Sequence, residues 1–246
     1  MKLSICIPVF NNYNLTKSCL QDLSFLPNDV EVIVCDNAST DDTINLLDLP
    51  KNQLPVNFKY IRNEDNLGFA KGSNLAYQRA VGKYIIFLNN DIRIKKNKTN
   101  WPLELIKHAE NNYIVGPTIG RLDGCFNFIS EYNHLEENTH LLQTTQKYKE
   151  YFGDGIFYLS GWCICAKKEI FDKLIINNYC GPFSEEFWTY FEDSDLSIRA
   201  NLLGIDIATI YIPIQHLGKM TSKKIGLATL YISAREKFIK KWTNKI

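Results

Sequence analysis

Polar residues gather where three apolar runs of the sequence end. The segments Pro8–Asn11, Asp36–Asn37 and Asn89–Asp91 each follow a run of strand length. Ligands of open parallel sheets sit outside the carboxyl ends of the strands, which is where these residues would lie. Asn and Asp also end strands and begin turns, so any one segment alone has a purely structural interpretation. Because three strand ends of one predicted sheet are marked in this way, we predict a binding site there.

A second group of acids lies in the later half of the chain, in "YFEDSDLSIRA". Glu192 and Asp193 directly precede a predicted helix, whose first amides favour ionised carboxylates. Simple helix capping is the structural interpretation of this pair. Asp195 and Arg199 are spaced i,i+4, which predicts a structural ion pair.

The elements that must position these residues follow from the apolar pattern. Over the first 120 residues, buried strand patterns alternate with helical patterns, which predicts a parallel sheet with right-handed crossovers. The predicted strands are 3–10, 30–37, 57–63 and 83–91, and the predicted helices are 15–26, 39–49 and 70–81.

The second half is less regular. Segment 120–155 is polar and predicts one amphipathic helix within 134–152 or a loop. Beyond it we predict strands at 156–168 and 205–218, and helices at 168–174, within 191–204 after the Glu192–Asp193 pair (with Gly204 as its C-cap), and at 223–242.

Composition excludes several classes of protein. The 246 residues, 45% of them hydrophobic, suffice for one substantial core, and 28 basic against 27 acidic residues give a net charge of +1. No overall field would attract nucleic acid, so we expect no nucleic-acid partner. The seven cysteines contain no C-x-x-C pair, which favours a reducing compartment. With no signal peptide or spanning segment in the pattern, we expect a cytoplasmic protein with at most peripheral membrane contact through its basic terminal helix.

Several motifs together carry a family resemblance. "SICIPVFNN", "EVIVCDNASTDDT", "NEDNLGFAKGSN", "FLNNDI" and "FEDSDLSIRANLLG" resemble segments of glycosyltransferase family 2. The resemblance spans Lys2 to His216, apart from the insertion at 120–155. It implies an α/β chain with the GT-A (Rossmann-like) fold, a mostly parallel central sheet flanked by helices, in a single domain over 1–246. Residues 1–119 would form the nucleotide-sugar and metal half, 120–222 the acceptor half, and 223–246 a terminal helix.

For the donor half, the resemblance implies a divalent cation, Mg²⁺ or Mn²⁺, held by Asp91 with His216 as a further ligand. Such a cation neutralises the diphosphate as the bond to the sugar breaks. Many relatives carry an acid where this chain has Asn89, so we expect modest metal affinity. Lys71, placed at a predicted helix start, would meet phosphate together with the helix amides. The implied nucleotide-sugar contacts are Pro8, Phe10, Asp36, Asn66, Lys71 and Asn90.

For the acceptor half, the resemblance implies that Asp193 is the general base and that Glu192 orients it, although the two roles could be exchanged. Gly161 would permit close approach of the acceptor. Trp162 and Trp188 would offer apolar faces to its sugar rings.

The chain is therefore expected to be an inverting glycosyltransferase. Its donor would be a UDP-, dTDP- or GDP-sugar, with dTDP-rhamnose a first guess from rhamnosyltransferase-like relatives, and its acceptor a glycan or lipid-linked glycan. Two alternatives stay open. A nucleotidyltransferase would carry a Gly-rich basic loop after the first strand, which "VFNNYNLTK" does not provide. A silent nucleotide-sugar or glycan-binding module is the other alternative, motivated by Asn89.

Overall fold

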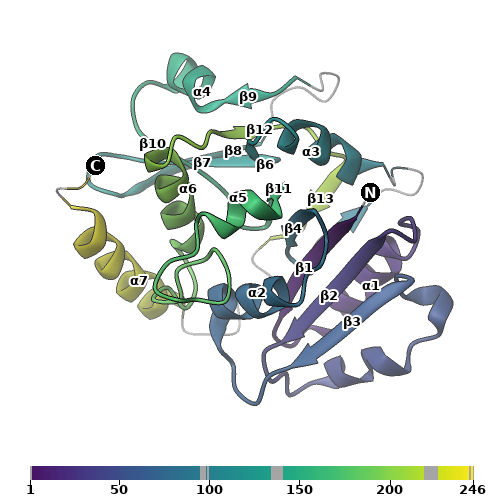
Figure 1. Cartoon of the computed structure of the whole chain (residues 1–246). Helices are drawn as coiled ribbons and strands as arrows, with labels where there is room; N and C mark the ends of the chain where they lie inside the picture. Colours follow the sequence, from purple (N-terminus) through teal and green to yellow (C-terminus); the bar gives the residue numbers. More distant parts are fainter. Residues whose placement is uncertain are drawn as a thin grey trace.

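An eight-stranded sheet forms the centre of the protein in a computed structural model that describes residues 2–94, 98, 100–133, 141–218, 227–243 and 245 (Figure 1). Its strand order is β3-β2-β1-β4-β11-β6-β12-β9. The strands of this sheet are β1 (Leu3–Val9), β2 (Val30–Asp36), β3 (Asn57–Arg62), β4 (Tyr84–Leu88), β6 (Ile114–Gly116), β9 (Gln143–Thr144), β11 (Cys163–Lys167) and β12 (Ile207–Thr209).

The four strands predicted in the first half of the chain all form, as β1, β2, β3 and β4, and they pair in parallel. β1 lies between β2 and β4, with Val9 opposite Asp36 in the register, so the polar ends of β1 and β2 lie side by side. β3 continues the parallel order outside β2. The mixed α/β fold with a large, mostly parallel central sheet agrees with the prediction.

The sheet continues from the first half of the chain into the second. β11 pairs antiparallel with β4, and Cys163 lies opposite Leu88. Because the two strands run in opposite directions, the beginning of β11 reaches the same edge of the sheet as the polar end of β4. Residues of the second half are thereby brought to the predicted binding edge.

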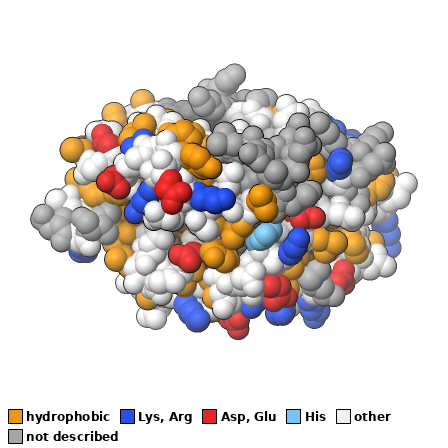
Figure 2. Space-filling model, turned by 90° about the horizontal axis from the view of Figure 1, so that it is seen from above, with side chains coloured by type: hydrophobic (Ala, Val, Ile, Leu, Met, Phe, Trp, Pro, Cys, Tyr) orange, Lys and Arg blue, Asp and Glu red, His pale blue; other side chains and the backbone are white. Residues whose placement is uncertain are grey.

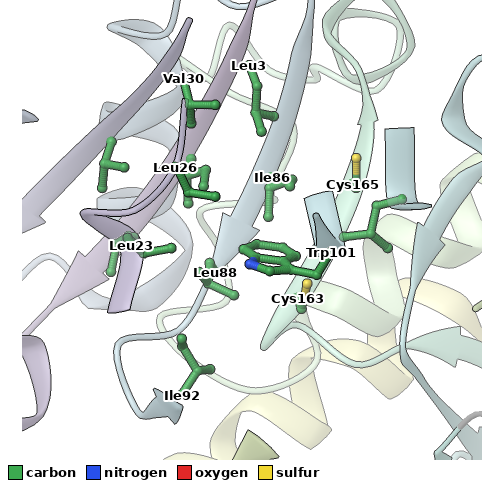
Figure 3. Close-up of a cluster of buried hydrophobic side chains, with 14 of the residues drawn as sticks. Leu3, Leu23, Leu26, Val30, Ile86, Leu88, Ile92, Trp101, Cys163 and Cys165 are labelled. Atoms are coloured by element: carbon green, nitrogen blue, oxygen red, sulfur yellow. The ribbon is translucent and has the colours of Figure 1, made fainter. Parts of the chain in front are cut away.

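Two layers of helices cover the sheet, one on each face, because successive side chains of its strands point to opposite faces and both faces are apolar. In β4, Ile86 and Leu88 belong to one buried cluster and Ile85 and Phe87 to another. The first cluster packs α1 and α3 against the sheet, and Trp101 lies within it near Leu88 and Cys163 (Figure 3). The second packs α2, α5 and α6. These helices are α1 (Tyr13–Leu23), α2 (Gly68–Gln78), α3 (Trp101–Ala109), α5 (Lys168–Asp172) and α6 (Glu192–Leu202).

Two small sheets complete the structure at the binding edge. One has the order β10-β7-β8 and the other pairs β13 with β5. Their strands are β5 (Ile92–Ile94), β7 (Thr118–Leu122), β8 (Phe128–Asn133), β10 (Ile156–Leu159) and β13 (Ile214–His216). The predicted single strands 156–168 and 205–218 were therefore wrong, because each is divided between two sheets.

The polar insertion has more structure than its sequence suggested. Its first part forms the β7–β8 hairpin, and its last part forms the predicted amphipathic helix as α4 (Thr145–Phe152). Residues 134–140, where that helix was allowed to begin, lie outside the described residues.

Other boundaries differ in ways that matter for the site. The predicted helix at 39–49 is a 3-10 helix, η1 (Asp42–Asp48), followed by η2 (Lys51–Gln53). Helix α2 begins at Gly68, so Lys71 does not open it as expected but lies within its first turn. Helix α3 was not predicted.

The terminal helix α7 (Leu227–Trp242) is anchored to α6. Ala234, Phe238 and Trp242 form the buried underside of α7. The predicted Asp195–Arg199 ion pair is confirmed at 2.7 Å, and the fully buried Asp195 carboxylate also accepts from Trp242 Nε1 at 3.1 Å and lies 2.8 Å from Lys241 Nζ. Residues 223–226 of the predicted helix lie outside the described residues.

The described residues include no helix with the length and apolarity needed to cross a bilayer. The face seen in Figure 2 carries acidic and basic side chains interspersed with hydrophobic ones. This distribution agrees with the near-zero net charge and offers no large field of a single sign on that face.

Candidate active site

A cavity of about 740 Å³ lies at the carboxyl ends of β1 and β4. Its lining comes from both halves of the chain: the end of β1, the segment after β4, the turn before β11, the segment before α6, and β13. The volume falls in the range of small-molecule sites. The two groups of acids that the sequence singled out therefore share one cavity.

One corner of the cavity holds Asp91 and His216, which are 125 positions apart in the sequence. β13 pairs with β5 so that His216 lies opposite Ile92, the residue that follows Asp91. His216 Nε2 is 3.1 Å from Asp91 Oδ1, and Trp162 stacks on the imidazole with ring centroids 4.7 Å apart and planes 6° apart. The predicted pairing of these two ligand candidates is thus present in the structure.

Asn89 completes this corner. Its Nδ2 is 3.4 Å from His216 Nε2, while its Oδ1 is buried and has no hydrogen-bond partner among the described residues. A buried polar atom without a hydrogen-bond partner lowers the stability of the folded protein, so this oxygen is a candidate to bind a ligand. Carboxylate, amide oxygen and imidazole suit Mg²⁺ or Mn²⁺. Within the described ranges no group of three or more His, Cys, Asp and Glu residues could hold a metal, and the modest affinity expected from Asn89 stays a prediction.

Four of the predicted nucleotide-sugar contacts line the cavity: Pro8, Phe10, Asn66 and Asn90. Asn90 is held by a hydrogen bond from its Nδ2 to Thr16 Oγ1, at 2.8 Å. Asn66 Oδ1 accepts from the amide of Gly68 at 3.1 Å and so shapes the start of α2.

Gly68 is required at this turn for two reasons. Its φ of +81° is costly for other residues, and a Cβ built there would lie 2.3 Å from the carbonyl oxygen of Trp188. The amide of Phe69 donates to that same oxygen at 2.7 Å. Gly68 therefore allows the segment before α6 to pack directly on the start of α2.

The remaining two predicted contacts, Asp36 and Lys71, lie away from the cavity lining. Asp36 is fully buried, where Tyr60 and Arg62 donate to one of its oxygens and the amide of Ser39 donates to the other at 2.9 Å. Lys71 points to Glu185, with Nζ 3.9 Å from the carboxylate. The Asp36 carboxylate is fully buried and already bonded, and Lys71 is exposed beside Glu185, so both roles stay predictions.

Asn37, the neighbour of Asp36, lines the cavity instead. Its Nδ2 donates to the carbonyl of Gly68 at 2.9 Å and its Oδ1 accepts from Asn63 at 2.8 Å. At this strand end, which the sequence pattern marked, Asn37 lines the cavity and Asp36 does not.

Opposite the Asp91 corner, Glu192 and Asp193 form the first turn of α6 and line the cavity. Asp193 Oδ2 accepts from the amide of Gly161 at 2.9 Å, and its Oδ1 accepts from the amide of Ser194 at 2.6 Å. Glu192 is buried, and its Oε2 has no hydrogen-bond partner within the described part of the chain. Both oxygens of Asp193 are therefore bonded to the protein, whereas one oxygen of Glu192 has no structural partner within the described residues.

Burial and neighbouring acids raise the pKa of both carboxyls. Burial first, and then the charge of Glu131, raise the pKa of Asp193 to about 6, although the Gly161 and Ser194 amides oppose the shift. Burial and the adjacent Asp193 hold the pKa of Glu192 well above its usual range. A carboxyl that titrates near neutral pH is suited to accept a proton during a reaction.

A backbone kink delivers these acids to the cavity. Tyr190 and Phe191 both have φ of 66°, a region that is costly for residues other than glycine, and all residues from Trp188 to Ser194 line the cavity. Such strain is characteristic of functional sites.

The structure places all three predicted acceptor contacts, Gly161, Trp162 and Trp188, at the cavity. Trp162 is buried, its Nε1 donates to Thr118 Oγ1 at 3.0 Å, and His216 covers one of its faces. Its visible role is to hold His216, so stacking of a sugar on Trp162 stays a prediction. Trp188 donates from Nε1 to the carbonyl of Asn66 at 3.3 Å and thus joins the two halves.

Sequence reasoning missed part of the lining. Leu122, Phe128, Glu131, Tyr158, Tyr190 and Tyr231 also line the cavity. Phe128 and Glu131 lie in the insertion that matched no motif, and Tyr231 lies in the terminal helix. The aromatic residues next to Glu192 and Asp193 were the one local signal that could have identified Tyr190.

Comparison with known proteins identifies the family. The model of "Glycosyl transferase family 2" matches residues 4–175, which is more than half of the chain. The chain belongs to glycosyl transferase family 2. The matched range includes the ends of β1, β2, β3 and β4 together with Asn89 and Asp91, while Glu192, Asp193 and His216 lie beyond it.

Individual relatives within the family agree. The uncharacterized glycosyltransferase YfnE of Bacillus subtilis (strain 168) is 27% identical over 243 residues, which cover 83% of this chain and 62% of that protein. Rickettsia glycosyltransferases that match over 118 residues are much longer, and the chain spans 19% or less of their length.

Solved structures show the same fold. TarS 1-349 of S. aureus in complex with UDP-GlcNAc has a TM-score of 0.62 at 19% identity, covering 100% of this chain and 68% of that one. GalNAc-T7 with UDP, GalNAc and Mn²⁺ has a TM-score of 0.69 at 13% identity, covering 100% of this chain and 48% of that one. Both are glycosyltransferases of the GT-A fold, and at these identities the likeness establishes the fold alone.

Proposed function

We propose that this family 2 chain transfers a sugar from a nucleoside diphosphate sugar to a hydroxyl of a glycan, with inversion at the anomeric carbon. The observation that carries the proposal is that the Asp91–His216 corner and the Glu192–Asp193 pair line the same cavity. A donor bound at the first site would present its sugar to an acceptor activated at the second.

The donor class is supported by what the similar structures contain. The S. aureus enzyme holds UDP-GlcNAc, and GalNAc-T7 holds UDP and Mn²⁺. In this chain Asp91, His216 and the Asn89 oxygen would hold the cation, which supplies charge neutralisation to the departing diphosphate when bound. Pro8, Phe10, Asn37, Asn66 and Asn90 would contact the rest of the donor.

Asp193 is proposed as the general base. Its pKa of about 6 leaves it ionised at neutral pH yet basic enough to take a proton. The acceptor oxygen forms a bond to the anomeric carbon as the bond from that carbon to the diphosphate breaks, and the hydroxyl proton passes to Asp193. A single displacement of this kind inverts the anomeric centre.

Glu192 is proposed as the neighbour that orients this step. Its raised pKa favours the protonated form beside an ionised Asp193, because two adjacent buried carboxylates cannot both ionise easily. A protonated Glu192 could donate a hydrogen bond from its carboxyl, and its unpartnered Oε2 would be the atom available to a ligand.

The proposal is tested by incubating the protein with UDP-, dTDP- and GDP-sugars and Mn²⁺, and measuring release of the nucleoside diphosphate. We expect hydrolysis of at least one donor, loss of that activity with EDTA, and loss in Asp91→Ala. Asp65→Ala is a matched control, since Asp65 is an exposed acid away from the cavity. Formation of a nucleoside triphosphate and a sugar 1-phosphate when pyrophosphate is added to the same donors would indicate a nucleotidyltransferase. Donor binding without any turnover would indicate a silent binding module.

A further inference from the structure

The end of the cavity nearest Asp193 has a composition of its own. It is formed by β8, β10, the kink before α6, and α7, and we call it the acceptor end. Its wall consists of Phe128, Glu131, Tyr158, Tyr190, Phe191 and Tyr231, together with the Glu192–Asp193 pair. These elements come from segments of the chain up to about a hundred residues apart.

Negative charge dominates the acceptor end. Glu131 is exposed on β8 and accepts from Ser160 Oγ at 2.9 Å, and its charge acts on Asp193. Together with the ionised Asp193 it places two carboxylates there, beside Glu192, whereas the described residues that line the whole cavity include no Lys or Arg. Such a surface accepts hydrogen bonds from hydroxyls and repels phosphate.

Aromatic rings supply the rest of this wall. Phe128 leaves 51% of its side chain exposed, and Tyr190 meets Tyr231 edge to face with centroids 5.6 Å apart. The ring of Tyr158 packs against β7 at Gly120, the residue opposite it in the β10–β7 pair. A Cβ added at Gly120 would lie 2.2 Å from the tyrosine ring, so only glycine leaves room for it. The half-exposed ring of Phe128 and the partly buried rings of Tyr190 and Tyr231, with their phenolic hydroxyls, suit a ligand with an apolar face and a polar edge, such as the C–H face of a sugar ring.

We infer that the acceptor is an uncharged sugar unit, which lies against Phe128, Tyr190 and Tyr231 and donates a hydroxyl hydrogen bond to Glu131, and that this end of the cavity excludes phosphate-bearing acceptors. The inference rests on the proposed function and specifies its acceptor class. Glu131 is here a specificity-determining residue, because its charge selects against anions without taking part in the transfer.

The first test compares acceptors that differ only in charge. Full-length protein with UDP and Mn²⁺ is titrated at pH 7.5 with octyl glycosides of glucose, galactose and N-acetylglucosamine and with their 6-phosphates, and binding is followed by saturation-transfer NMR. We expect at least one uncharged glycoside to bind at least tenfold more tightly than its phosphate. Equal or tighter binding of the phosphates, or no binding by any compound, would overturn the inference.

The second test uses variants with matched controls. Tyr231→Ala and Phe128→Ala should weaken binding of the uncharged glycoside about three- to tenfold. Ile232→Ala and Ile129→Ala should leave it unchanged, because these neighbours are exposed by 56% and 44% but do not line the cavity. Equal effects in variants and controls would contradict the aromatic wall.

The charge itself is tested by Glu131→Lys, which should reduce the preference for uncharged glycosides at least tenfold, with Glu131→Gln intermediate. An unchanged preference in Glu131→Lys would remove Glu131 from the inference. Binding of UDP with Mn²⁺ is measured in every variant. Intact UDP binding combined with phosphate tolerance would defeat this inference alone, whereas absent metal-dependent nucleotide binding in the unmodified protein would defeat the proposed function.

Discussion

The cavity has two walls that are built differently. The donor wall lies at the ends of β1, β2 and β4 and includes the Asp91 corner, and the acceptor wall consists of the acceptor end with Glu192 and Asp193. On the donor wall, amide side chains at the ends of parallel strands bond to other protein groups: Asn90 to Thr16, and Asn37 to Gly68 and Asn63. On the acceptor wall, Glu192 Oε2 has no partner within the described residues, and Phe128 is half exposed. Apart from Asn89 Oδ1 at the Asp91 corner, the donor wall is thus organised by its own contacts, while the acceptor wall offers an unpartnered carboxylate oxygen and an exposed ring to a ligand.

This contrast follows from topology. Parallel strands and their crossovers fix the donor wall within the first 91 residues, except for His216, which β13 contributes, and the register of β1 with β2 and β4 leaves little freedom there. The acceptor wall depends on hairpins and on α7, which contact it from distant parts of the chain. We infer that a fold of this kind can keep one donor wall while its acceptor wall changes.

The largest expected effect comes from removing the base. Asp193→Asn keeps the shape and a helix-capping group but cannot take the hydroxyl proton, so transfer should fall roughly 10²- to 10⁴-fold. Donor affinity, set by the other wall, should stay near that of the unmodified protein. Transfer rate and donor affinity are measured side by side. If Asp193→Asn is active and Glu192→Gln is not, the two roles are exchanged; activity in both would place the base elsewhere.

The next effect concerns Asp195, the buried carboxylate that joins α6 to α7 behind the acceptor wall. Asp195→Ala leaves Arg199, Lys241 and Trp242 without their shared partner, which should lower the free energy of unfolding by about 3 kcal/mol or more. Trp242→Phe, which loses only the N–H donor, should cost about 1 kcal/mol. Urea denaturation measures both.

Asp206→Ala is the control for Asp195→Ala, because Asp206 is exposed, and a change within about 0.5 kcal/mol is expected. A loss in Asp195→Ala no larger than in Asp206→Ala would show that α7 is not held through this carboxylate.

A smaller effect is expected from adding a carboxylate at the Asp91 corner. Asn89→Asp would place a second carboxylate beside Asp91 and His216, so Mn²⁺ should bind roughly tenfold more tightly in the presence of UDP. Calorimetric titration with Mn²⁺ measures this. Asn63→Asp is a matched control, because the Asn63 side chain contacts Asn37 and not the Asp91 corner. Unchanged or weaker Mn²⁺ binding in Asn89→Asp would contradict the assignment of this oxygen as a ligand.

The smallest effect is a shift in pH dependence. Because Asp193 must be ionised to act and its pKa is raised to about 6, transfer should rise with pH through about 6 and fall below it. Glu131→Gln removes one charge that raises this pKa, so the acidic limb should move to lower pH by a few tenths of a unit. A limb that moves upward, or an unmodified profile that is flat from pH 5 to 8, would argue against Asp193 as the titrating base.

Sequence patterns predicted the donor half well because its signals are local. Strands buried on both faces read as apolar runs, and the residues just after them mark the binding edge, which is how Asn90 and Asp91 were found. Asp36 shows the limit of such reasoning, since the pattern cannot tell that Arg62 and Tyr60 of β3 satisfy its carboxylate.

The acceptor half was harder to predict because its contacts are not local. The run 156–168 looks like one strand, and only pairing with β7 on one side and β4 on the other divides it at Ser160–Trp162. Nothing near Tyr231 indicates that α7 reaches the cavity. Helix α3 did carry a recognisable start signal, with Pro102 in its first turn.

The central claim is that one cavity holds the donor's diphosphate and cation at one wall and the base at the other. A crystal structure with an unreactive UDP-sugar analogue and Mn²⁺, using anomalous scattering at the manganese edge, tests this most directly. We predict Mn²⁺ bound to Asp91, His216 and the diphosphate, with the anomeric carbon on the side of the cavity that faces Asp193. Manganese bound away from Asp91 and His216, or a sugar directed away from Asp193, would contradict the claim.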